Sequence, residues 1–150
     1  RITVMQPRLD FYKASPDAAK AMLALEGAVT KLGLDKTLLE LVKLRASQIN
    51  GCAYCVDIHS SDARKHGESE RRLHAVAVWR EAPFFTERER AALAWTEALT
   101  RISETRAPDA DYEWLSSQFD EQERVNLTLA INAVNSWNRL AIGFRSVSAI

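Results

Sequence analysis

The sequence predicts an all-α fold in a single domain spanning residues 1–150, and three observations support this. No stretch shows the sustained alternation of apolar and polar residues that is typical of β-strands. The five glycines and four prolines mostly lie between helix-like stretches. Serine, threonine or aspartate, which cap helix N-termini, precedes several of these stretches. A chain of 150 residues is long enough to bury a core without a disulfide or a metal.

The predicted helices follow one another in chain order, each with a start or stop signal. Ser15 followed by Pro16 opens the first one. Capping boxes predict the starts of two later helices, because a threonine or aspartate is followed three residues on by glutamate. The expected helices are 16–32, about 35–48, 52–65, a short one over 69–82, 86–101, a short one over 111–118 and a last one from 120.

The segment from Leu34 to Ile49 is apolar around nearly its whole circumference, which indicates a helix buried on both sides. The last helix shows the same pattern. In a domain of this size, we expect a second subunit to cover the remaining side, so the sequence predicts a homo-oligomer. The alternative is a central helix within a monomer.

Composition excludes two classes of partner. Twenty basic residues balance twenty acidic ones, so no electrostatic footprint for nucleic acid or an anionic membrane is visible. No apolar run approaches the ~20 residues that span a bilayer. The first residues lack the apolar core of a signal peptide, and two cysteines in a chain of this size favour a reducing compartment. We therefore expect a cytoplasmic protein.

The two cysteines of the chain, Cys52 and Cys55, lie in one CxxC with His59 four residues further on. On a helix, residues three and four apart are neighbours, about 5–6 Å between Cβ atoms. If a helix begins near Cys52, the two thiols and the imidazole share one edge, and the thiols lie within disulfide range. The spacing predicts a dithiol/disulfide couple with a base beside it.

The surroundings of these thiols are expected to tune their reactivity. A thiol reacts as its thiolate, and the unpaired N–H groups of a helix N-terminus favour that anion. His59 can accept the proton of Cys55 directly or through water. Glu40 is a candidate partner for His59 if the turn at Asn50 and Gly51 folds the two helices side by side. Alternatively, Glu40 is a solvated partner of Lys36 and Lys43, which lie at helical spacing on its own helix.

A zinc site is the main structural alternative for the CxxC pair and its histidine. It would need a fourth ligand, either Glu40, His66 or His74, because the chain has no second CxxC. Outside such a site, His66 and His74 are expected at the surface or at helix ends. The four tryptophans are expected in the core or at an interface. A thioredoxin-type oxidoreductase would need a βαβ context, which the sequence does not show.

The spacing of Glu40, eleven intervening residues, Cys52-x-x-Cys55, three residues and His59 resembles the signature of the AhpD-like alkylhydroperoxidases. These proteins belong to the carboxymuconolactone decarboxylase superfamily. Residues 39–55 and 136–140 are also similar to its single-core-domain members. The resemblance implies a helical bundle that forms trimers or hexamers and reduces hydroperoxides without metal, flavin or haem. The decarboxylases of the superfamily lack the cysteine pair, which argues against lyase chemistry.

Carried over by position, the resemblance makes Cys55 the peroxidatic cysteine and Cys52 the resolving one, with His59 and Glu40 as a proton relay. Electrons would return from a lipoyl-bearing or thioredoxin-like protein. Position alone would favour Cys52 as the more acidic thiol, because it lies nearer the helix N-terminus. Tyr54 stands where AhpD itself has a histidine, which shortens the expected relay. The competing hypothesis is a redox-responsive binding module whose CxxC disulfide changes assembly or partner binding without turnover.

Overall fold

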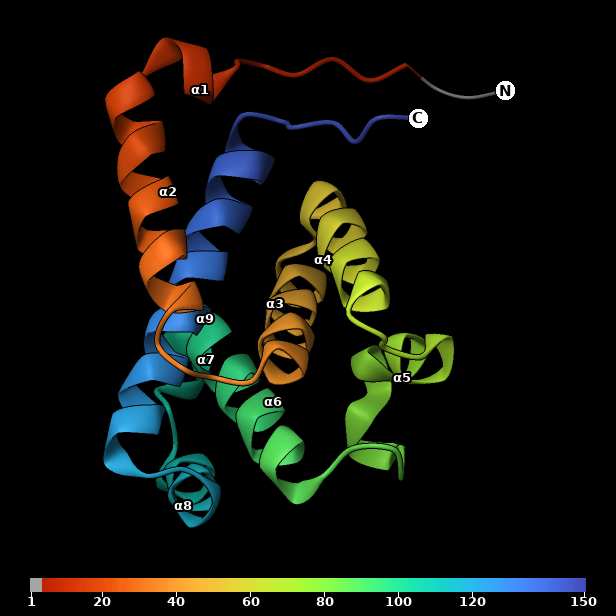
Figure 1. The fold of residues 1–150 in the computed structure, drawn as a ribbon, viewed down its shortest axis with the longest axis vertical. Helices are drawn as coiled ribbons and strands as arrows, with labels where there is room; N and C mark the ends of the chain where they lie inside the picture. Colours follow the sequence, from red (N-terminus) through yellow and green to blue (C-terminus); the bar gives the residue numbers. More distant parts are fainter. Residues whose placement is uncertain (1–3) are drawn as a thin grey trace.

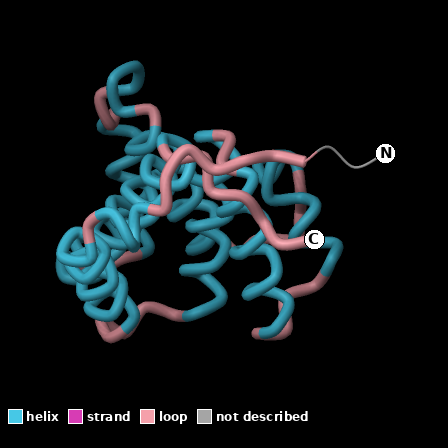
Figure 2. The backbone as a smooth tube through the Cα atoms, turned by 90° about the horizontal axis from the view of Figure 1, so that it is seen from above, coloured by secondary structure: helices cyan, strands magenta, loops and turns pink. Residues whose placement is uncertain are grey.

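The computed structural model describes residues 4–150, and it is helical, with no β-strand among these residues (Figure 2). Short loops join the helices, and none of the described helices has the length and apolar character needed to cross a membrane. The elements are α1 (Phe11–Ala14), α2 (Pro16–Thr30), α3 (Lys36–Asn50), α4 (Ala53–Lys65), α5 (Glu70–Ala75), the 3-10 helix η1 (Val76–Glu81), α6 (Glu87–Thr100), α7 (Ile102–Thr105), α8 (Asp109–Gln118) and α9 (Glu121–Gly143).

Helix α3 lies at the centre of the fold and packs against α4, α6 and α9 (Figure 1). Its Leu38 and Val42 belong to one core cluster with α6, α8 and α9. Its Leu41 and Leu44 belong to a second cluster with α4, α5, η1 and α6. One chain therefore covers both apolar sides of α3, as in the monomeric alternative. The pattern does not require a second subunit, and a trimer or hexamer remains a prediction.

Most helix boundaries agree with those predicted from the caps. Asp35 accepts a hydrogen bond from the backbone of Leu38, and both predicted capping boxes form, at the starts of α6 and α9. Helix α8 begins at Asp109, two residues earlier than expected. Where one short helix was expected over 69–82, α5 tightens into η1. Helices α1 and α7 were not predicted, because four residues are too few to show periodicity.

The turn between α3 and α4 depends on Gly51, whose φ of 73° lies in the left-handed region. Glycine adopts this conformation without the strain that a β-carbon would add. The backbone N–H of Cys52 then donates to the carbonyl of Ser47 at 3.0 Å, which closes the turn. The chain reverses here, so α4 runs back along α3 (Figure 1).

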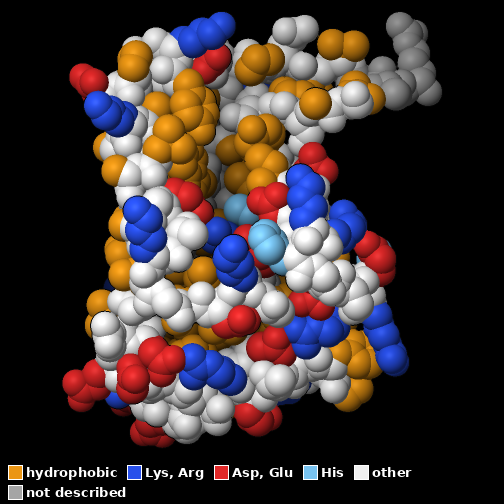
Figure 3. All heavy atoms as spheres, viewed as in Figure 1, with side chains coloured by type: hydrophobic (Ala, Val, Ile, Leu, Met, Phe, Trp, Pro, Cys, Tyr) orange, Lys and Arg blue, Asp and Glu red, His pale blue; other side chains and the backbone are white. Residues whose placement is uncertain are grey.

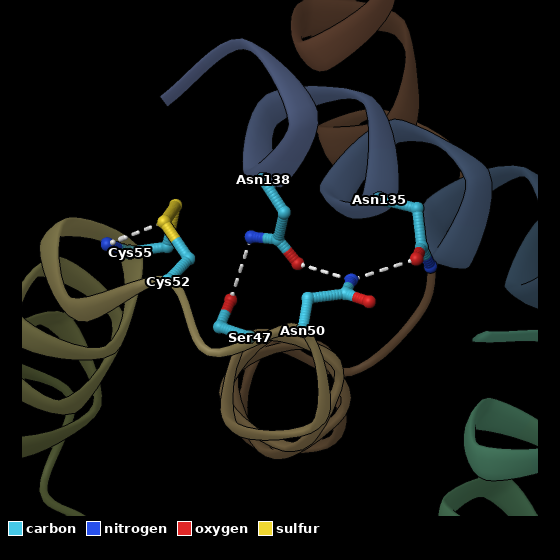
Figure 4. The surroundings of a disulfide bond; sticks show 6 residues. All are labelled: Ser47, Asn50, Cys52, Cys55, Asn135 and Asn138. Carbon is cyan, nitrogen blue, oxygen red and sulfur yellow. Dashed lines mark hydrogen bonds between the residues drawn. A yellow bond between two sulfur atoms is a disulfide. The ribbon is translucent and has the colours of Figure 1, made fainter. Parts of the chain in front are cut away.

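A buried polar network fixes this turn against α9 (Figure 4). Asn138 is fully buried, and its amide donates to the Ser47 hydroxyl at 3.0 Å. The Asn50 amide donates to the side-chain oxygens of Asn138 at 2.8 Å and Asn135 at 2.9 Å. Side chains of α9 therefore hold the end of α3, directly before the CxxC.

We predict that Asn138→Ala lowers the free energy of unfolding by about 1–3 kcal/mol, because buried partners of Asn138 lose their hydrogen bonds. The matched control is Asn132→Ala, since Asn132 is exposed on the same helix. This control should change stability by no more than about 0.5 kcal/mol. Urea unfolding followed by circular dichroism measures both, and equal stabilities of the two variants would contradict the assigned role of the network.

Candidate functional site

Cys52 and Cys55 form a disulfide at the N-terminus of α4, with Cα atoms 5.2 Å apart. Cys52 is the N-cap, with extended backbone, and Cys55 lies in the first turn. The backbone N–H of Cys55 donates to the sulfur of Cys52 at 3.2 Å. Both cysteines are buried, 2% and 4% exposed, and pack with Ala141 of α9. The predicted dithiol/disulfide couple is thus present in its oxidised state.

Glu40 on α3 and His59 on α4 face each other, as expected from the turn between these helices. Glu40 Oε2 lies 3.6 Å from His59 Nδ1, slightly beyond hydrogen-bond distance. Both atoms are buried, and neither has a hydrogen-bond partner among the described residues. His59 Nδ1 is buried against the carboxylate, and the His59 residue also lines a cavity. A carboxylate that orients an imidazole in this way fixes which nitrogen exchanges protons.

Lys43 extends this pair into a chain of charged groups across three helices. Its ammonium lies 3.8 Å from Glu40 Oε1 and 2.9 Å from Glu26 Oε1 on α2. Glu26 Oε2 in turn accepts a hydrogen bond from the indole N–H of Trp137 on α9 at 3.2 Å. The lysine and Glu40 side chains are 12% and 11% exposed, so water screens their charges weakly.

The pKa of the Glu40 carboxyl lies below its ordinary value of 4.5. Burial is the largest influence and acts in the opposite direction, because it disfavours the charged form. The His59 ring and the Lys43 ammonium together outweigh it. Glu40 is therefore a carboxylate near neutral pH, able to stabilise an imidazolium at His59.

A cavity of about 450 Å³ opens beside Cys55, between α2, α4 and α9. The N-terminal segment and the C-terminal segment run side by side over it, joined by the Arg8 N–H donating to the Phe144 carbonyl at 2.9 Å (Figure 1). Hydrophobic side chains cover the upper part of this face, and charged ones gather below (Figure 3). The walls include the aromatic residues Phe11, Tyr12, Tyr54 and Trp137.

Other candidates from the sequence lie outside the site. His66 ends α4, with Nδ1 2.7 Å from the carbonyl oxygen of Asp62, and His74 is exposed. Both occupy the surface positions expected, and the cluster of potential metal ligands among the described residues includes neither of them nor a cysteine. Glu40, His59 and Asp62 do place ligand atoms within 4.8 Å of one another. The Lys43 ammonium beside Glu40 opposes a cation there.

Three residues of the site were not recognised from the sequence: Glu26, Lys43 and Trp137. Lys43 was weighed as a surface partner of Glu40 at helical spacing, and the structure shows this contact alongside the contact with His59. Trp137 was assigned to the core or an interface, but it lines the cavity. Glu26 lies on another helix, 14 residues before Glu40, and no local spacing connects the two.

Comparisons with known proteins agree with this arrangement. Residues 16–98 match the family model of the carboxymuconolactone decarboxylase family. The uncharacterised protein YdfG of Bacillus subtilis is 40% identical over 145 residues, covering 97% of this chain and 99% of YdfG. The AhpD alkyl hydroperoxide reductase of Maricaulis maris is 44% identical over 44 residues, which cover 29% of this chain and 25% of that protein.

A solved structure from Agrobacterium tumefaciens, of a protein described as a putative antioxidant defence protein AhpD, superposes with a TM-score of 0.95. It is 49% identical, and the match covers 97% of this chain and 99% of that one. Both the family model and the match to the Agrobacterium structure span the helices that carry the CxxC and its glutamate. The chain therefore belongs to the carboxymuconolactone decarboxylase family, as one of its AhpD-like members.

Proposed function

We propose that this protein is a thiol-dependent peroxidase that reduces organic hydroperoxides or hydrogen peroxide with its CxxC pair. The observation that carries the proposal is the Cys52–Cys55 disulfide, whose Cys55 lines a cavity together with His59, the partner of Glu40. Family membership is consistent with this activity, as AhpD proteins occur among the relatives.

In the reduced protein, the thiol proton of Cys55 moves to His59 and leaves a thiolate. The thiolate attacks the terminal oxygen of the hydroperoxide and the O–O bond breaks, which gives a sulfenic acid on Cys55 and an alkoxide. His59 returns the proton to the alkoxide, and the alcohol leaves. Cys52 then attacks the sulfenic sulfur, the disulfide forms and water departs. An external dithiol supplies two electrons and two protons to restore both thiols.

Access to the cavity supports Cys55 as the cysteine that meets the peroxide. Cys55 lines the cavity, whereas Cys52 does not. Cys52 caps the helix, and its place at the N-terminus favours it as the more acidic thiol. A thiolate must also reach the substrate, however. Cys52 lies one turn away within bonding distance of Cys55, as resolving the sulfenic acid requires.

The Glu40–His59 pair supplies the proton transfers in this proposal. The lowered pKa of Glu40 keeps a negative charge beside His59 Nδ1, which favours the imidazolium formed when the imidazole takes the thiol proton. Tyr54 replaces the histidine of AhpD and lines the cavity as an apolar wall. One histidine therefore carries both the proton uptake and the proton return.

We further propose a lipoyl-bearing or thioredoxin-like protein as electron donor, a cytoplasmic location and a trimeric or hexameric homo-oligomer. A reducing compartment regenerates the dithiol, and such donors exchange two electrons with a disulfide by thiol attack. The competing hypothesis is a redox-responsive binding module. It needs the same disulfide but no proton relay, and the buried Glu40–His59 pair favours turnover.

We expect peroxide consumption with excess dithiothreitol in the wild type, and loss of turnover to background in Cys55→Ser. In Cys52→Ser, turnover through the intramolecular disulfide should cease. One equivalent of peroxide, added after dithiothreitol is removed, should still convert Cys55 to a sulfenic acid that dimedone traps. His59→Ala should lower the rate by about 10²-fold, the size of a lost general acid–base catalyst. Peroxide consumption and mass spectrometry of the labelled protein measure these effects.

His74→Ala is the matched control, because the His74 side chain is 79% exposed and lies outside the site. It should keep the wild-type rate. Wild-type turnover in Cys55→Ser would refute the nucleophile assignment. Negligible rates in all proteins, combined with a peroxide-dependent change in oligomeric state, would favour the redox-responsive binding module instead.

The Glu40 carboxyl should titrate below 4.5 in the folded protein, and the midpoint should rise in His59→Ala. Removing the ring leaves the burial that raises the pKa while taking away the largest influence that lowers it. Carboxyl ¹³C chemical shifts followed by NMR from neutral to acidic pH give the midpoint. Because this pKa is lowered on folding, Glu40 stabilises the fold above its ordinary pKa, and this contribution is lost as the pH falls through the lowered value.

The exposed His74 again offers a control, because His74→Ala should leave the Glu40 midpoint where it is. A wild-type midpoint at or above 4.5 would show that burial outweighs the His59 and Lys43 contacts. Glu40 would still be ionised near neutral pH after such a result, but a strong interaction between its carboxylate and His59 would be contradicted.

A further inference from the structure

The charges that line the cavity beside Cys55 are mostly negative. Three carboxylates line it, from Asp10, Glu26 and Asp62. Lys43 is the one lysine or arginine among the lining residues within the described chain. No salt bridge within residues 4–150 neutralises Asp10 or Asp62. The lining therefore carries an excess of negative charge at neutral pH, whatever the state of His59.

The single lysine that lines the cavity is already paired. Lys43 lies 2.9 Å from Glu26 and 3.8 Å from Glu40, and its side chain is 12% exposed. Trp137 donates to the second oxygen of Glu26 and so holds this carboxylate from the opposite helix. The ammonium of Lys43 is thus directed at two carboxylates and is not free to receive an anionic group of a substrate.

The remaining walls are apolar and aromatic. Phe11 stacks on Tyr12 with ring centroids 4.6 Å apart, and Tyr12 lies nearly parallel to Trp137 with centroids at 6.5 Å. Such walls favour a flat or branched apolar group. A carboxylate that entered this cavity would lose water without gaining an unpaired lysine or arginine, which is costly in an environment of low dielectric constant.

We propose that Glu26 is a specificity-determining residue: by neutralising Lys43, it restricts the cavity to uncharged organic hydroperoxides and rejects those that carry a carboxylate. This inference rests on the proposed peroxidase function, since it names the substrates of the same site. It assigns to Glu26 no part in the chemistry at sulfur. Substituting Glu26 by glutamine keeps its shape and an acceptor for Trp137 but removes the nearer of the two carboxylates that pair with Lys43, which leaves the ammonium able to attract an anion.

The test compares cumene hydroperoxide with its para-carboxylate derivative, which react at the same peroxide group and differ in charge. With dithiothreitol as the reductant at neutral pH, the wild type should prefer the uncharged compound by about tenfold or more in kcat/KM. Higher ionic strength should reduce this preference. Glu26→Gln should reduce the preference for the uncharged compound, because kcat/KM for the carboxylate compound should rise.

Two further variants separate Glu26 from general effects of charge. Glu113→Gln removes one negative charge from the exposed surface of α8, away from the cavity, and should leave the preference at the wild-type value. Lys43→Met removes the cation, so the preference should remain at or above the wild-type value. Thermal melting of each variant confirms that it is folded.

Equal kcat/KM values for the two compounds in the wild type would overturn the inference. It would also be overturned if Glu26→Gln and Glu113→Gln showed the same ratio of kcat/KM for the neutral and the carboxylated compound. If the wild type reduces neither compound, the proposed function fails. The selection of the cavity between neutral and anionic compounds can still be measured by binding. The two corresponding alcohols, titrated into the oxidised protein by NMR, then report binding directly. Equal affinities for the neutral and the carboxylated alcohol would refute the inference independently of any turnover.

Discussion

The reversal of the chain at Gly51 is the constraint on which the site depends. A left-handed residue at this position ends α3 and lets α4 run back along it, so that Glu40 and His59, nineteen positions apart, come within 3.6 Å. The same turn leaves Cys52 as the N-cap of α4 and places Cys55 in its first turn. The Glu40–His59 contact and the disulfide are thus two consequences of one backbone conformation. Asn138 holds the end of α3 from α9, through hydrogen bonds to Ser47 and Asn50 directly before the turn.

Local signals in the sequence accounted for the parts of the structure that depend on neighbouring residues. The capping boxes fixed the starts of α6 and α9, and the CxxC spacing gave the disulfide, because both are determined within one turn of helix. The contact of Glu40 with His59 was predicted only on the condition that the turn brought their helices together. That condition holds because Gly51 reverses the chain and α4 then packs along α3.

The features that the sequence did not reveal depend on packing between distant segments. Glu26 joins the site because α2 lies beside α9, where the Trp137 indole meets its carboxylate, 111 residues away in sequence. The cavity itself needs the two chain ends to lie side by side, which no local pattern indicates. For the same reason, the apolar circumference of α3 leaves the predicted oligomer untested. Apolar residues on all sides of a helix show that it is buried, but not which chain buries it.

The energetics of the charged chain favour a functional rather than a stabilising role. Glu40, Lys43 and His59 are largely removed from water, and buried ion pairs contribute little net stability because desolvation offsets their attraction. Glu40 Oε2 and His59 Nδ1 also lack hydrogen bonds, and an unsatisfied buried polar group costs about 1–3 kcal/mol. Apolar side chains of similar volume would pack α3 against α4 at least as well. The arrangement instead keeps a carboxylate and an imidazole facing each other beside the disulfide, at a distance that a small movement converts into a hydrogen bond. That is the property a proton relay requires, since its contacts must form and break as the proton moves.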